Sequence, residues 1–495
     1  MRRFWTLTLT AILLLSACGP SSGNQSASTG TPGLLPASSC GNGICEAGES
    51  SSSCPQDCPA TAFSGRVATA YIKSDGSTGN IAVMVASPKT KRYPEGAGIV
   101  VVIPPIFSEA DGFMRDPDLT SLGLIQVSFL WPGKADPKTG VESGGTFDYG
   151  GENSSQVLRD VIRFAGGRIA DTNGRYIFGL ASVPPLSEEV GLYAFGDAGL
   201  AGVNALSVYG DQLQGLQYYV GRENSTVDTI SSMEIGYYND TGLPVYNPFY
   251  LYPASYSFSS LTLNYTNLLW DPTYTSSRSK AVGRPYLDLD GNATISAADY
   301  VFDGQTPTIS GKRYYSTALT QALLDNGVLT LDVWPKDLAT PQEAAQFWQI
   351  RQTPGQNPDR FADMQKDTLH QNLKVMLVFA QDDHAQVAQD KPHIHQAYQG
   401  FRFEAKLSWV RLNPDRVYVQ SIMPGDRLDF PDNPANTQPD DWTKIGSYAY
   451  PGQGVAGRLV PLAAVAEMAD RAHAGFWDEN LGQVLYISTL STPQP

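Results

Sequence analysis

The sequence has no excess of basic residues, few histidines and no cysteine beyond position 58. It holds 34 Lys and Arg against 49 Asp and Glu, and this net charge of −15 argues against an extended basic surface for nucleic acid. All five cysteines lie near the start, so disulfides do not hold the rest of the chain together. With 42% hydrophobic and 17% charged residues, the chain has enough apolar material for a large core.

The first residues have the pattern of an export signal. A charged start precedes an apolar run, Phe4 to Leu15, that is too short to span a membrane. Leu15-Ser16-Ala17-Cys18 resembles the bacterial lipobox. The resemblance implies a signal peptide at 1–17, lipidation of Cys18 and membrane attachment through this lipid anchor. Gly19, which is not Asp, favours the outer membrane or cell surface.

Two short segments follow the predicted anchor. Residues 18–39 are rich in Ser, Gly, Pro and Thr, which predicts a flexible tether. Residues 40–59 contain Cys40, Cys45, Cys54 and Cys58. In an exported chain these four cysteines predict a small module with two disulfides of open connectivity, and a zinc site is the alternative.

Buried strands and helices alternate along the main body of the chain. Apolar runs at 98–103, 124–130, 190–195, 216–220, 374–379 and 407–412 predict strands, and 66–72 with 80–86 predict an antiparallel hairpin. Segments 154–164, 200–209 and 392–401 predict helices, the first capped by Asn153 or Ser154, and Thr340 with Glu343 forms a capping box. We expect an α/β fold with a mostly parallel sheet and helices on both faces.

The turn after the 190–195 strand carries a family resemblance. Its sequence, Val190-Gly-Leu-Tyr-Ala-Phe-Gly196-Asp197-Ala-Gly199, resembles the nucleophile elbow of the α/β-hydrolase family, in which small residues allow a sharp turn from strand to helix. The members of this family that the sequence resembles are esterases, oligopeptidases and dienelactone hydrolases. The resemblance implies an α/β-hydrolase-like domain over 60–495 with a large cap insertion at 224–370.

The motif departs from the family at the nucleophile and at the oxyanion donors. In the usual G-x-S-x-G register Gly196 occupies the nucleophile position, and in a register shifted by one Asp197 occupies it, as in relatives with an aspartate nucleophile. Asp197 is alternatively a cap of the helix that follows. Pro104 and Pro105 remove two N–H donors from the loop where relatives stabilise an oxyanion.

The sequence has a candidate for the catalytic acid at the position that the family uses, but no histidine where the family places its catalytic base. Asp383 follows the 374–379 strand, where the family places its catalytic acid, although Asp at such a position also caps turns. No histidine lies between His395 and His473, so His473 is the remaining candidate for the base, with ordinary packing as its alternative. His384, His393 and His395 are expected to be solvated loop residues, with metal binding by the last two as the alternative.

A calcium-loop motif lies inside the predicted insertion. The segment 288–299 resembles the loop of EF-hands and dockerin modules, with oxygen donors at loop positions one, three, five, seven, nine and twelve. These donors are Asp288, Asp290, Asn292, Thr294, Ser296 and Asp299. Position six is Ala293, where the turn favours glycine. The alternative is an acidic turn followed by a helix that Ser296 caps.

Two classes of function are compatible with these features. One is a hydrolase of an ester, amide or alkyl bond at the cell surface, and the other is a non-catalytic descendant that binds a small molecule, a peptide or a sugar. Because the serine and a well-placed histidine are missing, the sequence favours the second class and leaves enzymatic activity open.

Overall fold

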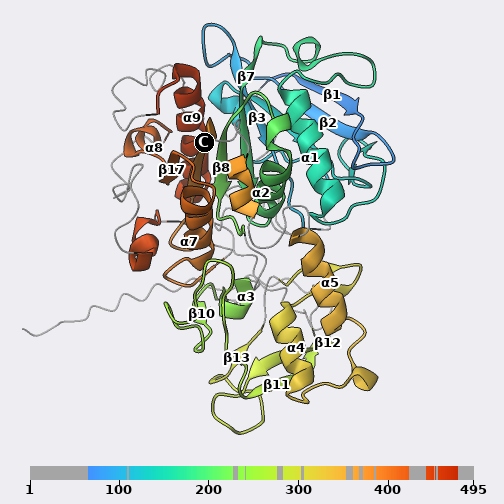
Figure 1. Ribbon diagram of the computed structural model, residues 1–495, viewed down its shortest axis with the longest axis vertical. Helices are drawn as coiled ribbons and strands as arrows, with labels where there is room; N and C mark the ends of the chain where they lie inside the picture. The colour runs from blue at the N-terminus through green and yellow to red at the C-terminus, as the bar shows by residue number, and fades with distance from the viewer. Residues whose placement is uncertain are drawn as a thin grey trace, which may run out of the picture. The chain divides into compact units, whose positions relative to one another are not determined.

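An eight-stranded sheet forms the centre of the computed structural model, which describes residues 65–108, 111–226, 232–239, 241–275, 282–302, 306–352, 360–366, 372–383, 386–422, 442–450, 452 and 455–477 (Figure 1). Its order is β1-β2-β4-β3-β7-β8-β16-β17, and in this sheet β2 alone runs antiparallel to its neighbours. The strands are β1 (Val67–Ile72), β2 (Ile81–Ala86), β3 (Ala97–Val102), β4 (Ile125–Phe129), β7 (Pro185–Phe195), β8 (Leu216–Arg222), β16 (Lys374–Val378) and β17 (Trp409–Leu412).

The central strands form where the apolar runs predict them. Every residue of β2, β3 and β4 is buried, as expected for strands that are covered on both faces. The predicted hairpin is confirmed, with Ile72 opposite Ile81 in the pairing of β1 with β2.

Helices cover both faces of this sheet (Figure 1). On one face α1 (Glu152–Ala165), α2 (Ala198–Tyr209) and α7 (Pro392–Gln399) contribute to one apolar core, and on the other α8 (Arg416–Ile422) and α9 (Val455–Ala474) contribute to a second. The mixed α/β class, the mostly parallel sheet and the helices on both of its faces are confirmed. No helix among the described residues is long and apolar enough to cross a membrane.

Small sheets and short helices make up the described part of 224–370. They are α3 (Ser232–Ile235), β9 (Gly236–Tyr238), β10 (Pro244–Tyr246), β11 (Leu268–Thr275), β12 (Val282–Leu287), β13 (Tyr300–Val301), β14 (Thr308–Ile309), β15 (Lys312–Arg313), α4 (Thr317–Asp325), the 3₁₀ turn η4 (Leu331–Val333), α5 (Pro341–Gln352) and α6 (Arg360–Asp363). Strands β11, β12 and β13 form an antiparallel sheet that shares an apolar core with α4. The capping box of α5 is confirmed, because Thr340 N donates to Glu343 and Glu343 N donates to Thr340 Oγ1.

Two local predictions differ from the structure. Helix α1 begins at Glu152, and the side chain of Asp148 accepts the N–H groups of Gly151, Asn153 and Ser154, so the expected cap by Asn153 or Ser154 is wrong. Strand β7 begins five residues before the apolar run, in a half-exposed stretch without a hydrophobic pattern. The predicted signal peptide, tether and cysteine module lie outside the described residues, as do Cys18 and the four cysteines at 40–58.

Candidate functional site

The turn from β7 into α2 places Gly196 at the elbow. Gly196 has φ 55°, a left-handed conformation that glycine adopts without steric cost, and α2 begins two residues later at Ala198. In α/β-hydrolases the nucleophile stands on a strained strand-to-helix turn of this kind. Because Gly196 has no side chain, this elbow presents no nucleophilic atom at its tip.

Asn224, two residues after the end of the neighbouring strand β8, holds the elbow in place. This buried side chain donates from Nδ2 to the carbonyl oxygens of Gly196, at 2.9 Å, and Arg222, at 3.0 Å, and its Oδ1 accepts from Tyr219 Oη at 2.6 Å. A Cβ on Gly199 would lie 2.6 Å from Asn224 Cβ, so the helix approaches this side chain only with glycine there. No local pattern in the sequence points to Asn224, because the turn that it contacts lies 28 positions earlier.

The carboxylate of Asp197 occupies the backbone donors of the loop after β3. Its two oxygens accept the N–H groups of Ile106 at 3.2 Å and Phe107 at 2.8 Å. Asp197 lies at the N-cap position of α2, as the alternative had it, but its side chain makes no cap hydrogen bond to the helix. Pro104 and Pro105 lack donors, as expected, but the two residues after them provide N–H groups.

Asp383 and His393 form a buried pair beyond the end of β16. Asp383 is fully buried, and its Oδ2 lies 2.8 Å from His393 Nε2, on the first turn of α7. Its Oδ1 also accepts the N–H of Gln386 at 3.2 Å, so Asp383 caps the turn and holds the imidazole. His395 stacks on Tyr256 with ring centroids 4.2 Å apart. His393 and His395 are both buried and face different partners, so the expected solvated histidines are wrong there, and His384 lies outside the described residues.

Further charged groups are buried beside this pair. The Lys391 ammonium donates to the carbonyl oxygens of Gln381 and Gln386. Burial lowers the pKa of Lys391, and the nearby carboxylates of Asp383 and Glu223 oppose that change. Burial raises the pKa of Asp382. A cation and several acids therefore share the region beyond the carboxyl ends of β8 and β16, which is the usual ligand-binding edge of a parallel sheet.

The loop directly after β17 begins with Asn413, and residues 413–416 include no histidine. Asn413 is buried with φ 62°, its Oδ1 accepts the N–H of Phe379 at 2.9 Å, and its Nδ2 donates to the carbonyl of Tyr448 at 2.6 Å. The side-chain amide of Asn413 therefore links the loop after β17 to two other segments of the chain, at Phe379 and at Tyr448. The structure thus gives Asn413 a structural role.

His473 has its partners at the amino-terminal half of β7. Its Nδ1 lies 3.0 Å from a Glu189 carboxylate oxygen, and its ring stacks on Tyr93 at a centroid distance of 3.8 Å. Asp383 follows the carboxyl end of the parallel strand β16. The structure therefore does not bring His473 together with Asp383 or with the elbow.

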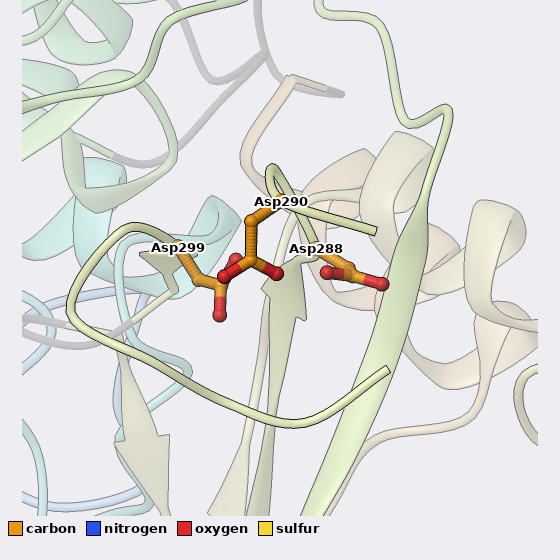
Figure 2. A group of neighbouring side chains, drawn as sticks. All are labelled: Asp288, Asp290 and Asp299. Carbon is orange, nitrogen blue, oxygen red and sulfur yellow. The ribbon is translucent and has the colours of Figure 1, made fainter. Parts of the chain in front are cut away.

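The predicted calcium loop joins β12 to β13. One oxygen from each carboxylate of Asp288, Asp290 and Asp299 lies within 4.8 Å of the others, and Figure 2 shows the three side chains gathered in the loop. Ala293 has φ 57°, the conformation expected at position six. A strand, β13, follows the loop, so the alternative of a helix capped by Ser296 is wrong.

Backbone N–H groups of the loop donate hydrogen bonds to its carboxylates and hold them in position. Asp288 accepts the N–H groups of Gly291, Asn292 and Ala293. Burial acts to raise the pKa of Asp299, but N–H donors, those of Leu289 and Ser296 foremost, hold it below the usual value. Asp299 is therefore kept ionised, which suits oxygen coordination of a hard cation.

Comparisons with known proteins add little to this description. No family model matches the chain, and no curated protein matches it. Matching solved structures include an esterase from the archaeon Pyrobaculum calidifontis, with 12% identity, 36% of this chain and 51% of the esterase covered, and a TM-score of 0.25. An arylesterase (11% identity, 34% and 49% covered, TM-score 0.24) and prolyl oligopeptidase B from Galerina marginata (14%, 34% and 22%, 0.22) also match. The chain spans at most 51% of these proteins, and likeness at such TM-scores carries no argument.

Proposed function

We propose that this chain is a cell-envelope lipoprotein whose α/β-hydrolase-like domain binds a ligand and does not hydrolyse it. One observation carries the proposal: the carboxylate of Asp197 lies on the N–H groups of Ile106 and Phe107. Gly196 at the elbow supports it, because the turn is kept while the nucleophile is missing. The ligand is a small molecule, a peptide or a sugar.

The position of Asp197 opposes acyl transfer for an electrostatic reason. A tetrahedral intermediate needs free donors about 2.7–3.1 Å from its developing negative charge, and loss of one such donor costs about 10²–10³ in kcat. Here a resident anion takes both hydrogen bonds. A second negative charge at the same place would also be repelled by the Asp197 carboxylate.

Labelling with a fluorophosphonate probe, which reports an activated serine, tests this proposal. We expect no labelling of the wild-type protein and none of Gly196→Ser, because Asp197 still occupies the donors. Gly174→Ser is a matched control for the stability that is lost when serine replaces a glycine with positive φ. Gly174 has φ 76°, is exposed and has open space around it. Labelling of the wild-type protein at any serine near the elbow would contradict the proposal.

An active hydrolase is the second candidate, and the Asp383–His393 pair favours it. Such a pair orients an imidazole for general-base catalysis. In this alternative Asp197 attacks the acyl carbon of an ester, the alcohol or phenol leaves, and water hydrolyses the resulting mixed anhydride. At an alkyl carbon Asp197 displaces the leaving group and water hydrolyses the resulting ester. Asp197→Ala and His393→Gln would then each abolish turnover of an alkyl or aryl ester that the wild type hydrolyses. If the wild-type protein turns over none of these substrates, the alternative fails.

We propose that the loop at 288–299 binds one structural calcium ion. Carboxylates of Asp288, Asp290 and Asp299, the Asn292 amide oxygen, the Thr294 carbonyl and the Ser296 hydroxyl would be its ligands. The clustering of three carboxylates and the left-handed Ala293 support this assignment.

The proposed place of the protein is the outer membrane or cell surface. Lipid at Cys18 would attach it, residues 18–39 would act as the tether, and disulfides among Cys40, Cys45, Cys54 and Cys58 would hold the module at 40–59. The catalytic assignment of His473 finds no support in its contacts with Glu189 and Tyr93.

A further inference from the structure

The insertion contains a hollow that the elbow does not involve. It has a volume of about 430 Å³, within the range of small-ligand pockets. It is lined by Trp270, Pro272, Val282, Pro335, Lys336 and Asp337, which come from β11, β12 and the segment after η4. We call it the Trp270 hollow.

The apolar part of the Trp270 hollow is held in a fixed position. Trp270 and Pro272 lie on β11, where its pairing with β12 becomes irregular after Asp271, and both line the hollow. Gly283, with φ 74°, lies against the indole so closely that a Cβ there would be 2.5 Å from Nε1. The backbone of β12 thus supports a half-buried indole that lines the hollow.

The polar part of the Trp270 hollow carries one uncompensated positive charge. Asp337 accepts the N–H of Val282 at 3.0 Å and pairs with Arg313 at 2.9 Å, so its charge is already balanced. Lys336 is exposed, and within the described part of the chain no ion pair involves it. In a chain of net charge −15 this local excess of positive charge stands out.

We propose that the Trp270 hollow binds an acidic sugar, a pyranose ring that carries a carboxylate. The hollow is open, since Pro272, Val282 and Lys336 are exposed, so its occupant keeps one side in water. A pyranose has an apolar face for the indole and a hydroxylated rim for solvent. The Lys336 ammonium recognises the carboxylate by a charge-assisted hydrogen bond. This inference is independent of the proposal for the elbow.

Calorimetric titration of the full chain tests the site with trigalacturonic acid and with its methyl ester, which has the same rings without the charges. We expect the acid to bind more tightly than the ester. Trp270→Ala weakens both by at least about tenfold, and Trp270→Phe, which keeps a ring, retains most of the affinity. Lys336→Gln lowers the affinity for the acid to that for the ester. Lys138→Gln, at an exposed lysine on another part of the chain, changes neither.

The result depends on a folded insertion, so the melting curve of each variant is recorded alongside. If Trp270→Ala unfolds the insertion, Trp270→Phe and Lys336→Gln still decide the matter. Absence of binding by the acid, or equal binding by wild type and Lys336→Gln, would overturn the proposal. Binding of phenylacetate with the same dependence on Lys336, but none of the sugar, would replace it with an aromatic carboxylate site.

Discussion

Left-handed backbone conformations gather where parallel strands of the central sheet end. Gly196 after β7, Glu223 after β8 and Asn413 after β17 have φ of 55°, 49° and 62°. For a residue other than glycine such a conformation costs on the order of 1–3 kcal/mol and persists where the surroundings enforce it. The N–H of Glu223 donates to the carbonyl of Val378 at 2.7 Å, which contributes to that enforcement. Strained backbone is therefore concentrated at the carboxyl-end edge of the sheet, where parallel sheets usually bind their ligands.

His395 is a single residue whose environment makes a testable difference to stability. Burial lowers its pKa from 6.5 to about 4. Between these two values the unfolded chain binds more protons than the folded one, so stability rises with pH in this window and is lost as pH falls through it. Each unit of pKa difference corresponds to about 1.4 kcal/mol. The wild-type protein should therefore weaken between pH 6.5 and 4 partly through this one group.

His395→Phe isolates that contribution, because phenylalanine can stack on Tyr256 and takes up no proton. The difference in unfolding free energy between variant and wild type, measured by denaturant titration, should change in favour of the variant as pH falls from 6.5 to 4. Other groups titrate equally in both proteins and cancel. A difference that is constant over this range would show that the imidazole is not protonated on unfolding.

At the scale of secondary-structure elements, local patterns predict the strands well and their side-chain partners poorly. The buried runs around Ile99 and Val127 are continuous in the sequence, so a window of six residues suffices to find β3 and β4. The partners of Asp197 are Ile106 and Phe107, roughly ninety positions earlier, and no local pattern connects them. The sequence places His384, His393 and His395 close to Asp383 along the chain, but that His393 is the one that contacts it depends on how α7 packs beyond the end of β16.

The β12–β13 loop is the element where metal removal is most informative. Without a cation the carboxylates of Asp288, Asp290 and Asp299 repel one another. Binding of calcium, at a free concentration a hundred times Kd, adds about 2.7 kcal/mol to the free energy of unfolding. Chelation should therefore lower the Tm of the wild type and of Asp332→Asn, at an exposed acid outside the loop. It should leave the Tm of Asp288→Ala unchanged. Identical wild-type melting curves with and without chelator would exclude a stabilising calcium ion.

At the scale of the whole molecule, buried charges join α9 to the sheet domain. Arg92 pairs with Asp470, and Glu467 accepts from Arg411 and Arg471 at 3.1 and 2.8 Å, all of them buried. Burial raises the pKa of Glu467 to about 7, and the two guanidinium groups oppose that change. The sequence shows only an apolar helix with a few charges at this place. Their partners, as far away as 378 residues, become known only when the chain is folded.

Attachment of the whole protein to a membrane depends, in our proposal, on one atom, the Cys18 sulfur. Each buried methylene of an acyl chain contributes about 0.8 kcal/mol, so several chains give a firm anchor. Cys18→Ala should therefore move the protein from the membrane fraction to the soluble fraction. Gly19→Asp is the matched control, because it keeps the lipidated cysteine and, by the resemblance, should shift the protein from the outer to the inner membrane on a density gradient. If Cys18→Ala remains with the membranes, another part of the chain attaches it and lipidation at this cysteine is not the anchor.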